Sequence, residues 1–267
     1  VGGPTANFRH PSCAKQLEVG VCRDRQCLFP KPCPNLDADH NDYIELLQKV
    51  RALPGIKKVF VRSGIRYDYL LADKNDRFLD ELCRYHVSGQ LKVAPEHVAE
   101  HALANMGKPG KEVYLKFMRA FNKKNKEIGL KQFLVPYFIS SHPGCTLRDA
   151  VELSEFLRDI GHQPEQVQDF IPTPGSASTA MYYSGINPET GKKVFVARNP
   201  HDKAMQRALM QYKNPKNRQL VKEALQKTNR GDLIGDNAGC LLKIAASYNP
   251  KARHSKNTAN PKMNKRR

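Results

Sequence analysis

The sequence predicts an α/β fold built on parallel strands, and three observations support this prediction. Short apolar runs occur near residues 59, 91, 134 and 168, at intervals of roughly 32 to 43 residues. Each run stops at turn-forming residues, and stretches of helical periodicity separate successive runs. Alternation of this kind is typical of parallel strands joined by helical crossovers.

Periodicity alone does not distinguish a closed barrel from an open, doubly wound sheet, because both alternate strand and helix. The chain contains neither a GxGxxG nor a GxxxxGK[ST] loop. The usual dinucleotide-binding and nucleotide-binding versions of the open sheet need one of these loops. The sequence therefore favours a partial barrel.

The predicted strands are rich in residues that suit a pleated sheet, and each ends at a residue that cannot continue the ladder. Ser63-Gly64 ends the first strand, Pro95 the second and Pro172 the fourth. The third runs into His142-Pro143-Gly144. The predicted ranges are 59–61, 91–94, 133–139 and 167–171.

The predicted helices show apolar residues at helical spacing, and several are bounded by capping residues or by proline and glycine. Acidic and amide residues over 37–42 precede the first of them, and Pro54-Gly55 ends it. The sequence predicts a last short helix after the loop at 230–235. The other predicted helices are 43–50, 77–86, a short piece before 108–110, 112–128, 147–160, 201–212 and 217–228.

The chain has a formal net charge of +18, and this charge is unevenly distributed. Residues 1–191 carry 25 Lys and Arg against 22 Asp and Glu, whereas residues 192–267 carry 19 against 4. The seven basic residues of 251–267 have no acidic counterpart, which predicts a disordered tail. Such a tail could contact RNA or another polyanion, or it could simply improve solubility.

Seven cysteines, an odd number, and the lack of a secretory segment favour a reducing cytoplasm. No apolar run reaches the roughly 18 residues of a membrane span. Four cysteines lie in a proline-rich stretch over 13–33, which predicts an irregular loop without a helix. These four residues are Cys13, Cys22, Cys27 and Cys33. They could bind zinc, an iron–sulfur cluster or no metal at all.

Polar residues that follow the predicted strands are the candidate binding residues, because ligands bind at the carboxyl ends of parallel strands. Ser63 and Arg66 follow the first strand, and Glu96 and His97 follow the second. Arg66 could bind a carboxylate, or it could pair with a nearby aspartate on the surface. His142 follows the third strand and is more often a loop histidine than a ligand. The small polar residues of 176–183 could cover the barrel mouth or form a plain surface connection.

Several short stretches occur in a distinctive order along the chain. They are Gly2-Gly3-Pro4-Thr5-Ala6-Asn7, Cys33-Pro34-Asn35, Ser63-Gly64-Ile65-Arg66-Tyr67-Asp68, Leu91-Lys92-Val93-Ala94-Pro95-Glu96-His97, Met106-Gly107-Lys108-Pro109-Gly110, Pro136-Tyr137-Phe138-Ile139 and His142-Pro143-Gly144. This order resembles the YgiQ family of radical S-adenosylmethionine (SAM) proteins. The resemblance extends from Val1 to about Leu242.

The resemblance implies a radical SAM enzyme, in which a 4Fe-4S cluster on a CxxxCxxC loop cleaves SAM to a 5′-deoxyadenosyl radical. It implies the second half of a partial (β/α) barrel over 1–171, a family-specific extension over 172–245 and a basic tail over 246–267. Ser63, Arg66, Glu96 and His97 would then contact SAM. The chain departs from the family in lacking CxxxCxxC, and it opens without Met, so we expect a fragment whose cluster ligands lie upstream.

The sequence therefore leaves three candidate functions. The first is part of a radical SAM enzyme acting on an unknown substrate. The second is a metal-stabilised binding module that acts through the four cysteines of 13–33. The third is a basic RNA-binding protein, which ranks last because the core lacks a basic patch interleaved with aromatic residues.

Overall fold

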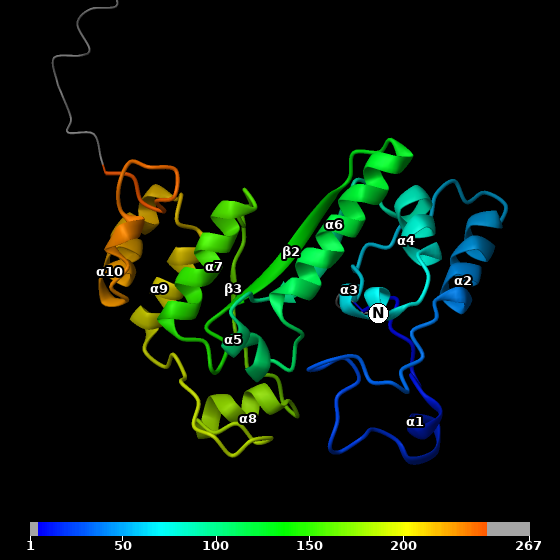
Figure 1. Ribbon diagram of the computed structural model, residues 1–267, viewed down its shortest axis with the longest axis horizontal. Helices are drawn as coiled ribbons and strands as arrows, with labels where there is room; N and C mark the ends of the chain where they lie inside the picture. Colours follow the sequence, from blue (N-terminus) through cyan, green and yellow to red (C-terminus); the bar gives the residue numbers. More distant parts are fainter. Residues whose placement is uncertain (1–4, 245–267) are drawn as a thin grey trace, which may run out of the picture.

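The computed structural model describes residues 5–244, and a parallel three-stranded sheet lies at its centre (Figure 1). The strands are β1 (Gln90–Glu96), β2 (Phe133–Ser140) and β3 (Gln168–Asp169), in the order β1-β2-β3. Both pairings are parallel. Three of the four predicted strands are therefore confirmed as parallel neighbours, although the third of these is only two residues long.

The helices match most of the predicted ranges. A π-helix, η1 (Leu82–His86), continues α4, and two short 3₁₀ helices, η2 (Pro215–Asn217) and η3 (Gly231–Leu233), flank α10. The α-helices are α1 (Ala14–Val19), α2 (Asn41–Ala52), α3 (Tyr67–Ala72), α4 (Arg77–Glu81), α5 (Glu100–Asn105), α6 (Lys111–Ile128), α7 (Leu147–Asp159), α8 (Ala177–Ser184), α9 (Pro200–Met210) and α10 (Arg218–Lys227).

The predicted strand at 59–61 is wrong, because these residues join no sheet. His86 satisfies the backbone of this segment instead. Its ring Nδ1 lies 2.8 Å from the Val59 carbonyl oxygen, and its own carbonyl accepts a bond from the Val61 N–H at 2.9 Å. The contact with β1 comes slightly later in the chain, as an isolated parallel bridge between Ile65 and Val93.

The prediction of an irregular loop without a helix over 13–33 is wrong at α1, and the small polar run of 176–183, for which the sequence predicted no helix or strand, forms α8. Helix α1 lies within the cysteine-rich loop, where the Cys13 thiol accepts a hydrogen bond from the Gln16 N–H and so caps it. The prolines that argued against a helix all follow Cys27. Ser176 caps α8 in the same manner through the Thr179 N–H, so the small polar run forms a helix.

Two more differences concern helix α3 and the last predicted helix. Helix α3, which is not among the predicted helices, begins directly after Arg66. The loop at 230–235 contains the 3₁₀ turn η3, and the described chain after this loop, up to Ile244, has no helix. The predicted tail over 246–267 and the first residues of the N-terminal stretch, Gly2 to Pro4, lie outside the described residues.

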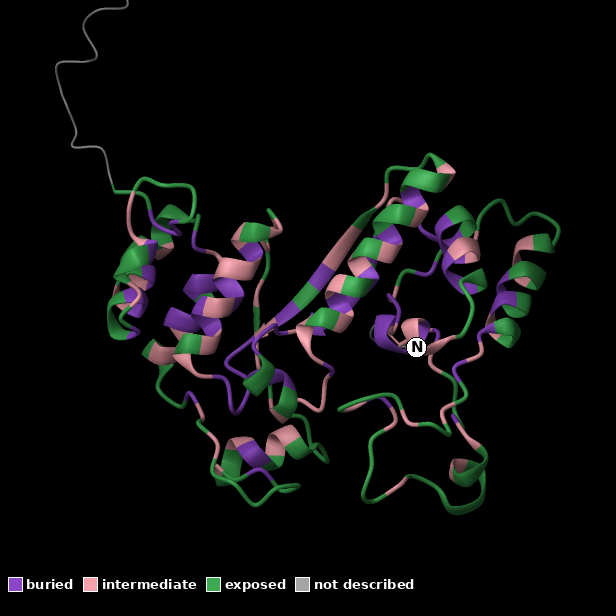
Figure 2. Cartoon of the chain, viewed as in Figure 1, coloured by how far each residue is buried: buried purple, intermediate pink, exposed green. Residues whose placement is uncertain are grey.

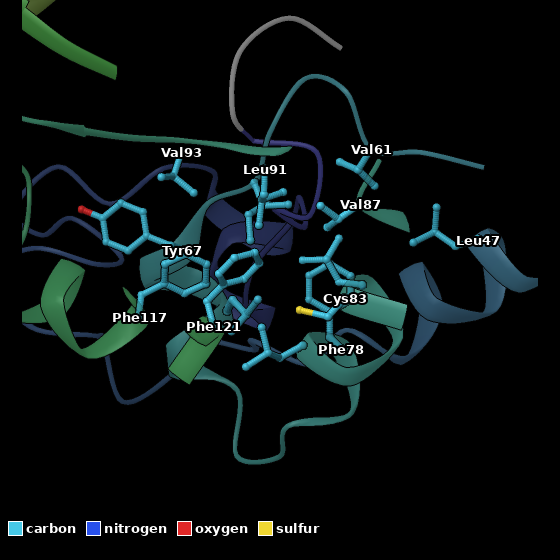
Figure 3. Packing of buried hydrophobic residues seen from close by; sticks show 14 of the residues in the cluster. Leu47, Val61, Tyr67, Phe78, Cys83, Val87, Leu91, Val93, Phe117 and Phe121 are labelled. Carbon is cyan, nitrogen blue, oxygen red and sulfur yellow. The ribbon is translucent and has the colours of Figure 1, made fainter. Parts of the chain in front are cut away.

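The largest core cluster lies between β1 and helices α3, α4, η1 and α6 (Figures 2 and 3). Leu91 and Val93 of β1 and Phe117 and Phe121 of α6 are all essentially inaccessible to solvent. Burial of a side chain of this size stabilises the fold by about 1.5–3 kcal/mol. Helix α6 therefore anchors the first crossover against the sheet.

The helices that follow β1 and β2 cover the same face of the sheet. Leu91 and Val93 face α6, and Phe138 of β2 packs on Leu153 and Leu157 of α7. The opposite face is open in residues 5–244. Its exposed residues include Phe133 at 65% and Tyr137 at 48% of their full accessibility, with the Lys92 ammonium 5.9 Å from the Tyr137 ring.

Helices α9 and α10 of the predicted extension pack against α7 in a second cluster that includes Val151, Leu209 and Leu225. Figure 1 shows these three helices grouped together on the left. The extension thus shares a core with the last crossover helix of the sheet. The described strands form an open sheet, so barrel closure stays a prediction.

Candidate functional site

The loops after the parallel strands lie at one edge of the sheet, and the 63–66 loop reaches this edge through the Ile65 bridge to Val93. Gly64 permits this approach. Its φ is +90°, and a Cβ atom there would lie 2.5 Å from the Lys92 carbonyl oxygen. Only glycine fits this position, and the turn it makes delivers Arg66 to the start of α3.

The backbone of Arg66 is held by the buried side chain of Asn7. The Asn7 Oδ1 accepts from the Arg66 N–H at 2.7 Å, and its Nδ2 donates to the Arg66 carbonyl at 3.1 Å. The same Nδ2 lies 3.0 Å from His40 Nε2, and His40 Nδ1 lies 2.9 Å from an Asp73 carboxylate oxygen. Because Nε2 must accept from the amide, Nδ1 carries the proton and donates to Asp73.

Burial is the main cause of the lowered pKa of His40, which keeps this imidazole neutral. The chain Asp73–His40–Asn7 therefore fixes Arg66 without adding a second cation. Sequence reasoning did not identify Asn7, His40 or Asp73 as site residues. The only signal was Asn7 itself, which lies in one of the stretches that carry the family resemblance.

The Arg66 guanidinium pairs with Asp68, one of the expected aspartates, but this carboxylate is buried rather than on the surface. Its Nε and Nη2 each donate to the carboxylate at 2.9 Å, and the Phe8 ring centroid lies 5.5 Å from its Cζ. Nη1 has no hydrogen-bond partner among residues 5–244. Ser63 is half-buried, and its hydroxyl is likewise unbonded within this range. Both groups keep donors available for a ligand.

Glu96 occupies a strained position at the end of β1. Its φ is +68°, and the His97 N–H bonds to the Pro95 carbonyl at 2.8 Å across it, which makes a γ-turn. Lys108 reaches a Glu96 carboxylate oxygen at 3.4 Å and the Ala94 carbonyl at 3.3 Å. Strained residues of this kind cluster at ligand sites and switch regions.

His97 is placed inside the core rather than toward an opening. Its Nδ1 accepts from the Ala99 N–H at 3.1 Å, so Nε2 carries the proton and donates to the Cys145 sulfur at 3.4 Å. Burial lowers the pKa of His97 to about 4 and raises that of the Cys145 thiol. This geometry orients the loop after Glu96 and leaves His97 no free nitrogen for a ligand.

His142, at the end of β2, is also buried and fully bonded. Its Nδ1 lies 2.7 Å from the Pro143 carbonyl oxygen, and its Nε2 lies 2.8 Å from the Ser178 hydroxyl of α8. Burial is the main cause of its lowered pKa. Here α8 meets the strand-end loops, so the helix lies where the sequence allowed for a cover over the sheet edge.

The four clustered cysteines line one cavity of about 260 Å³, which also contacts Arg25. The pKa of Cys33 is lowered, first by a hydrogen bond from the Asn35 backbone and then by the nearby Arg25 guanidinium. No group of three or more His, Cys, Asp or Glu side chains within residues 5–244 is placed to hold a metal ion. The cysteines of this cavity are Cys13, Cys22, Cys27 and Cys33.

A second cavity of about 290 Å³ joins the cysteine-rich loop to the sheet edge. Arg66 and Gly107 line it from one side, and three of the four cysteines line it from the other. The loop approaches closely, since a Cβ on Gly107 would lie 2.5 Å from the Gln26 Oε1. Glu96 and His97 do not line this cavity, so the structure brings Arg66, but not these two, to the cysteines.

No helix among residues 5–244 combines the length and the apolar character needed to cross a membrane. The basic region after residue 191 presents Arg198 and Lys203 beside the Tyr182 ring, at 5.9 Å and 5.2 Å from its centroid. Tyr183 next to it is exposed. A cationic surface with accessible aromatic rings therefore lies near α8.

Comparison with known proteins gives relatives named UPF0313 proteins. The chain is 53% identical to a UPF0313 protein of Clostridium perfringens over 265 residues, which is 99% of this chain and 40% of that protein. It is 56% identical to a UPF0313 protein of Clostridium botulinum over 242 residues, which is 91% of this chain and 38% of that protein. The chain thus spans about two fifths of the length of these curated relatives.

A family model described as a domain of unknown function, DUF3362, matches residues 165–266. The match begins just before β3 and covers the extension and tail that the sequence predicts from residue 172 onward. The names of these relatives and the description of the family model state no activity.

Proposed function

We propose that this chain is the C-terminal part of a radical SAM enzyme of the YgiQ type, with loops that bind SAM and face an unknown substrate. The stretches that resemble this family occur from Asn7 to His142, and they include residues of the sheet edge and of the cysteine-rich loop. The similarity to longer UPF0313 proteins agrees with a partial chain. The cytoplasm, where thiols stay reduced, is the proposed compartment.

The observation that carries the proposal is the parallel sheet with one open face. Parallel sheets are normally covered on both faces, because their strands are apolar on both. Here α6 and α7 cover one face, whereas the face of Phe133 and Tyr137 is open within the described residues. A barrel wall has this arrangement, with helices outside and the lumen on the other face.

The proposed SAM contacts follow from the donors and acceptors at the sheet edge. Nη1 of Arg66 would bind the methionyl carboxylate, with Asp68 keeping the guanidinium plane fixed. The Ser63 hydroxyl and the Glu96 carboxylate would bond the amine or the ribose hydroxyls. His97, which the sequence predicted as a fourth contact, would instead hold the Glu96 turn through Ala99 and Cys145.

The 4Fe-4S cluster of such an enzyme supplies the electron that cleaves SAM to a 5′-deoxyadenosyl radical. The chain has no CxxxCxxC, and we assign the ligands of this cluster to the part of the relatives that the chain does not span. The residues described here would bind and orient SAM and would form one side of the substrate chamber.

RNA binding is a second candidate because of the cationic surface near α8. Arg198 and Lys203 flank Tyr182, and Tyr183 is exposed beside them, so a nucleobase could stack there. This surface would fit an RNA substrate of the same enzyme or a separate binding role. Titration of a labelled single-stranded RNA with the wild type and with Arg198→Ala tests this RNA-binding role. Equal affinities of the two proteins that do not change with salt concentration would contradict it.

The radical SAM proposal is tested on a full-length UPF0313 relative reconstituted anaerobically with iron and sulfide. Reduction in the presence of SAM should yield 5′-deoxyadenosine. Replacement of the residue equivalent to Arg66 by Ala should weaken SAM binding by roughly 10-fold or more, because a charged hydrogen bond contributes about 1.5–3 kcal/mol. Replacement at His162, in the loop after α7, is the matched control. A cluster-loaded protein that forms no 5′-deoxyadenosine would refute the proposal.

A further inference from the structure

The cavity of the cysteine-rich loop is built by residues that are scattered over 21 positions of sequence yet share one space. Cys13 caps α1, and Cys27 Sγ lies 3.6 Å from the Ser12 hydroxyl. Cys33 Sγ lies 3.7 Å from Arg25 Nη1. None of the four is paired in a disulfide, and all four are partly accessible. The loop thus brings four free cysteines to the lining of one cavity.

The spacing of these thiols does not match a single metal ion. A structural zinc site needs four ligands at about 2.3 Å from one point. Within residues 5–244, however, no three Cys, His, Asp or Glu side chains are placed in that way. The four cysteines instead surround about 260 Å³, several times the roughly 30 Å³ that a water molecule occupies in the liquid.

An iron–sulfur cluster matches this arrangement better than zinc does. Each thiolate in such a cluster binds an iron atom rather than one shared ion, so the cysteine sulfurs stand farther apart. The inorganic sulfides and irons fill the space between them. Four cysteines around a cavity are therefore the expected protein half of a polynuclear cluster.

The surroundings of the cavity also suit an anionic cluster. Lys15 and Arg25 line it, with Asp24 as the single acidic lining residue. The Arg25 guanidinium can donate to a ligand sulfur of the cluster, because its Nη1 lies 3.7 Å from the Cys33 Sγ. Hydrogen bonds to cysteine sulfur and nearby cations both stabilise the added charge of a reduced cluster.

We propose that Cys13, Cys22, Cys27 and Cys33 ligate an iron–sulfur cluster of their own, separate from any radical-generating cluster upstream. The second cavity places this cluster beside Arg66, since three of its cysteines line that cavity too. The proposal goes beyond the radical SAM assignment and holds or fails independently of it. This chain contains no CxxxCxxC, so any cluster it carries by itself reports on these four cysteines alone.

The test is metal analysis of this 267-residue chain, purified anaerobically and reconstituted with ferrous iron and sulfide. The expected protein is brown and holds iron and acid-labile sulfide in equal amounts. Cys22→Ser should lose most of this iron. Cys240→Ser is the matched control, because the Cys240 thiol already bonds to the Asp232 carbonyl and the Asn237 side chain, bonds that a serine hydroxyl can make.

Alkylation provides a readout that does not depend on the folding of a variant. In the wild type, the cluster should shield its ligands from iodoacetamide, and a chelator should expose four additional thiols that peptide mapping assigns to 13–33. Stoichiometric zinc in place of iron, reconstituted protein without iron, or equal labelling with and without the chelator would each overturn the proposal. None of these results would bear on whether the full-length relative forms 5′-deoxyadenosine.

Discussion

Replacement of Asn7 by Ala should destabilise the chain substantially, because one buried amide serves three partners. The change removes the acceptor of the Arg66 N–H at 2.7 Å and the donor to both the Arg66 carbonyl and His40 Nε2. Each buried group left unbonded costs about 1–3 kcal/mol. His40 is buried and Arg66 is only partly buried, so the expected loss is about 2–5 kcal/mol.

Urea and thermal unfolding, followed by circular dichroism, measure this loss. For a chain of this size we expect the midpoint temperature to fall by roughly 5–15 °C. Asn122→Ala is the matched control, because Asn122 is exposed on α6, and such a surface change should stay within about 0.5 kcal/mol. If Asn7→Ala is also within that margin of the wild type, the Asn7 clamp on Arg66 is not a stabilising element and the reasoning fails.

Three other predictions concern the same sheet edge. Gly64→Ala should lower the free energy of unfolding in urea by at least about 2 kcal/mol more than Gly20→Ala does. Both glycines have positive φ, but only Gly64 lacks room for a Cβ atom. Equal losses for the two variants would contradict the close approach to β1. The pKa of His97 is 6.5 in the unfolded chain but about 4 in the folded chain, so between these values only the unfolded chain binds the proton. The free energy of unfolding should therefore fall by about 3 kcal/mol as the pH drops from 6.5 to 4. His97→Gln should flatten that slope, and an unchanged slope would assign it to other groups. Gln206→Leu should destabilise the chain by about 2–4 kcal/mol, because Gln206 holds the loop after β2 through Ser141 and Cys145. Hydrogen exchange of the Ser141 amide should then accelerate. Unchanged exchange would refute that role.

The sequence was informative where local pattern and tertiary structure agree. Strand β1 was predicted because apolar residues precede Pro95, and α6 because its apolar residues recur at helical spacing. The strand at 59–61 failed because a distant residue, His86, satisfies its backbone. No local pattern contains that bond, so propensity alone gives the wrong answer there.

The candidate site was predictable only in part, for the same reason. The sequence located Arg66 and Glu96 at strand ends, because the carboxyl ends of parallel strands share an edge. It could not show that Asn7 fixes Arg66 across 59 positions of sequence. It also could not separate Glu96, in a strained turn beside Lys108, from its neighbour His97, which is turned into the core. Burial of a single side chain depends on packing that adjacent residues do not share.

The cysteine-rich loop and the Arg66 loop are best understood as one structural unit. Asn7 holds Arg66 and lies only six positions before Cys13, so the segment that fixes the guanidinium also begins the cysteine-rich loop. Gly107 contacts the other side of that loop at Gln26. Arg66 and Gly107 both line the second cavity, which borders this loop. A group bound by the cysteines would therefore restrain one wall of the Arg66 cavity. Because coupling between two sites is reciprocal, a ligand held by Arg66 would also favour the loop conformation that gathers the thiols.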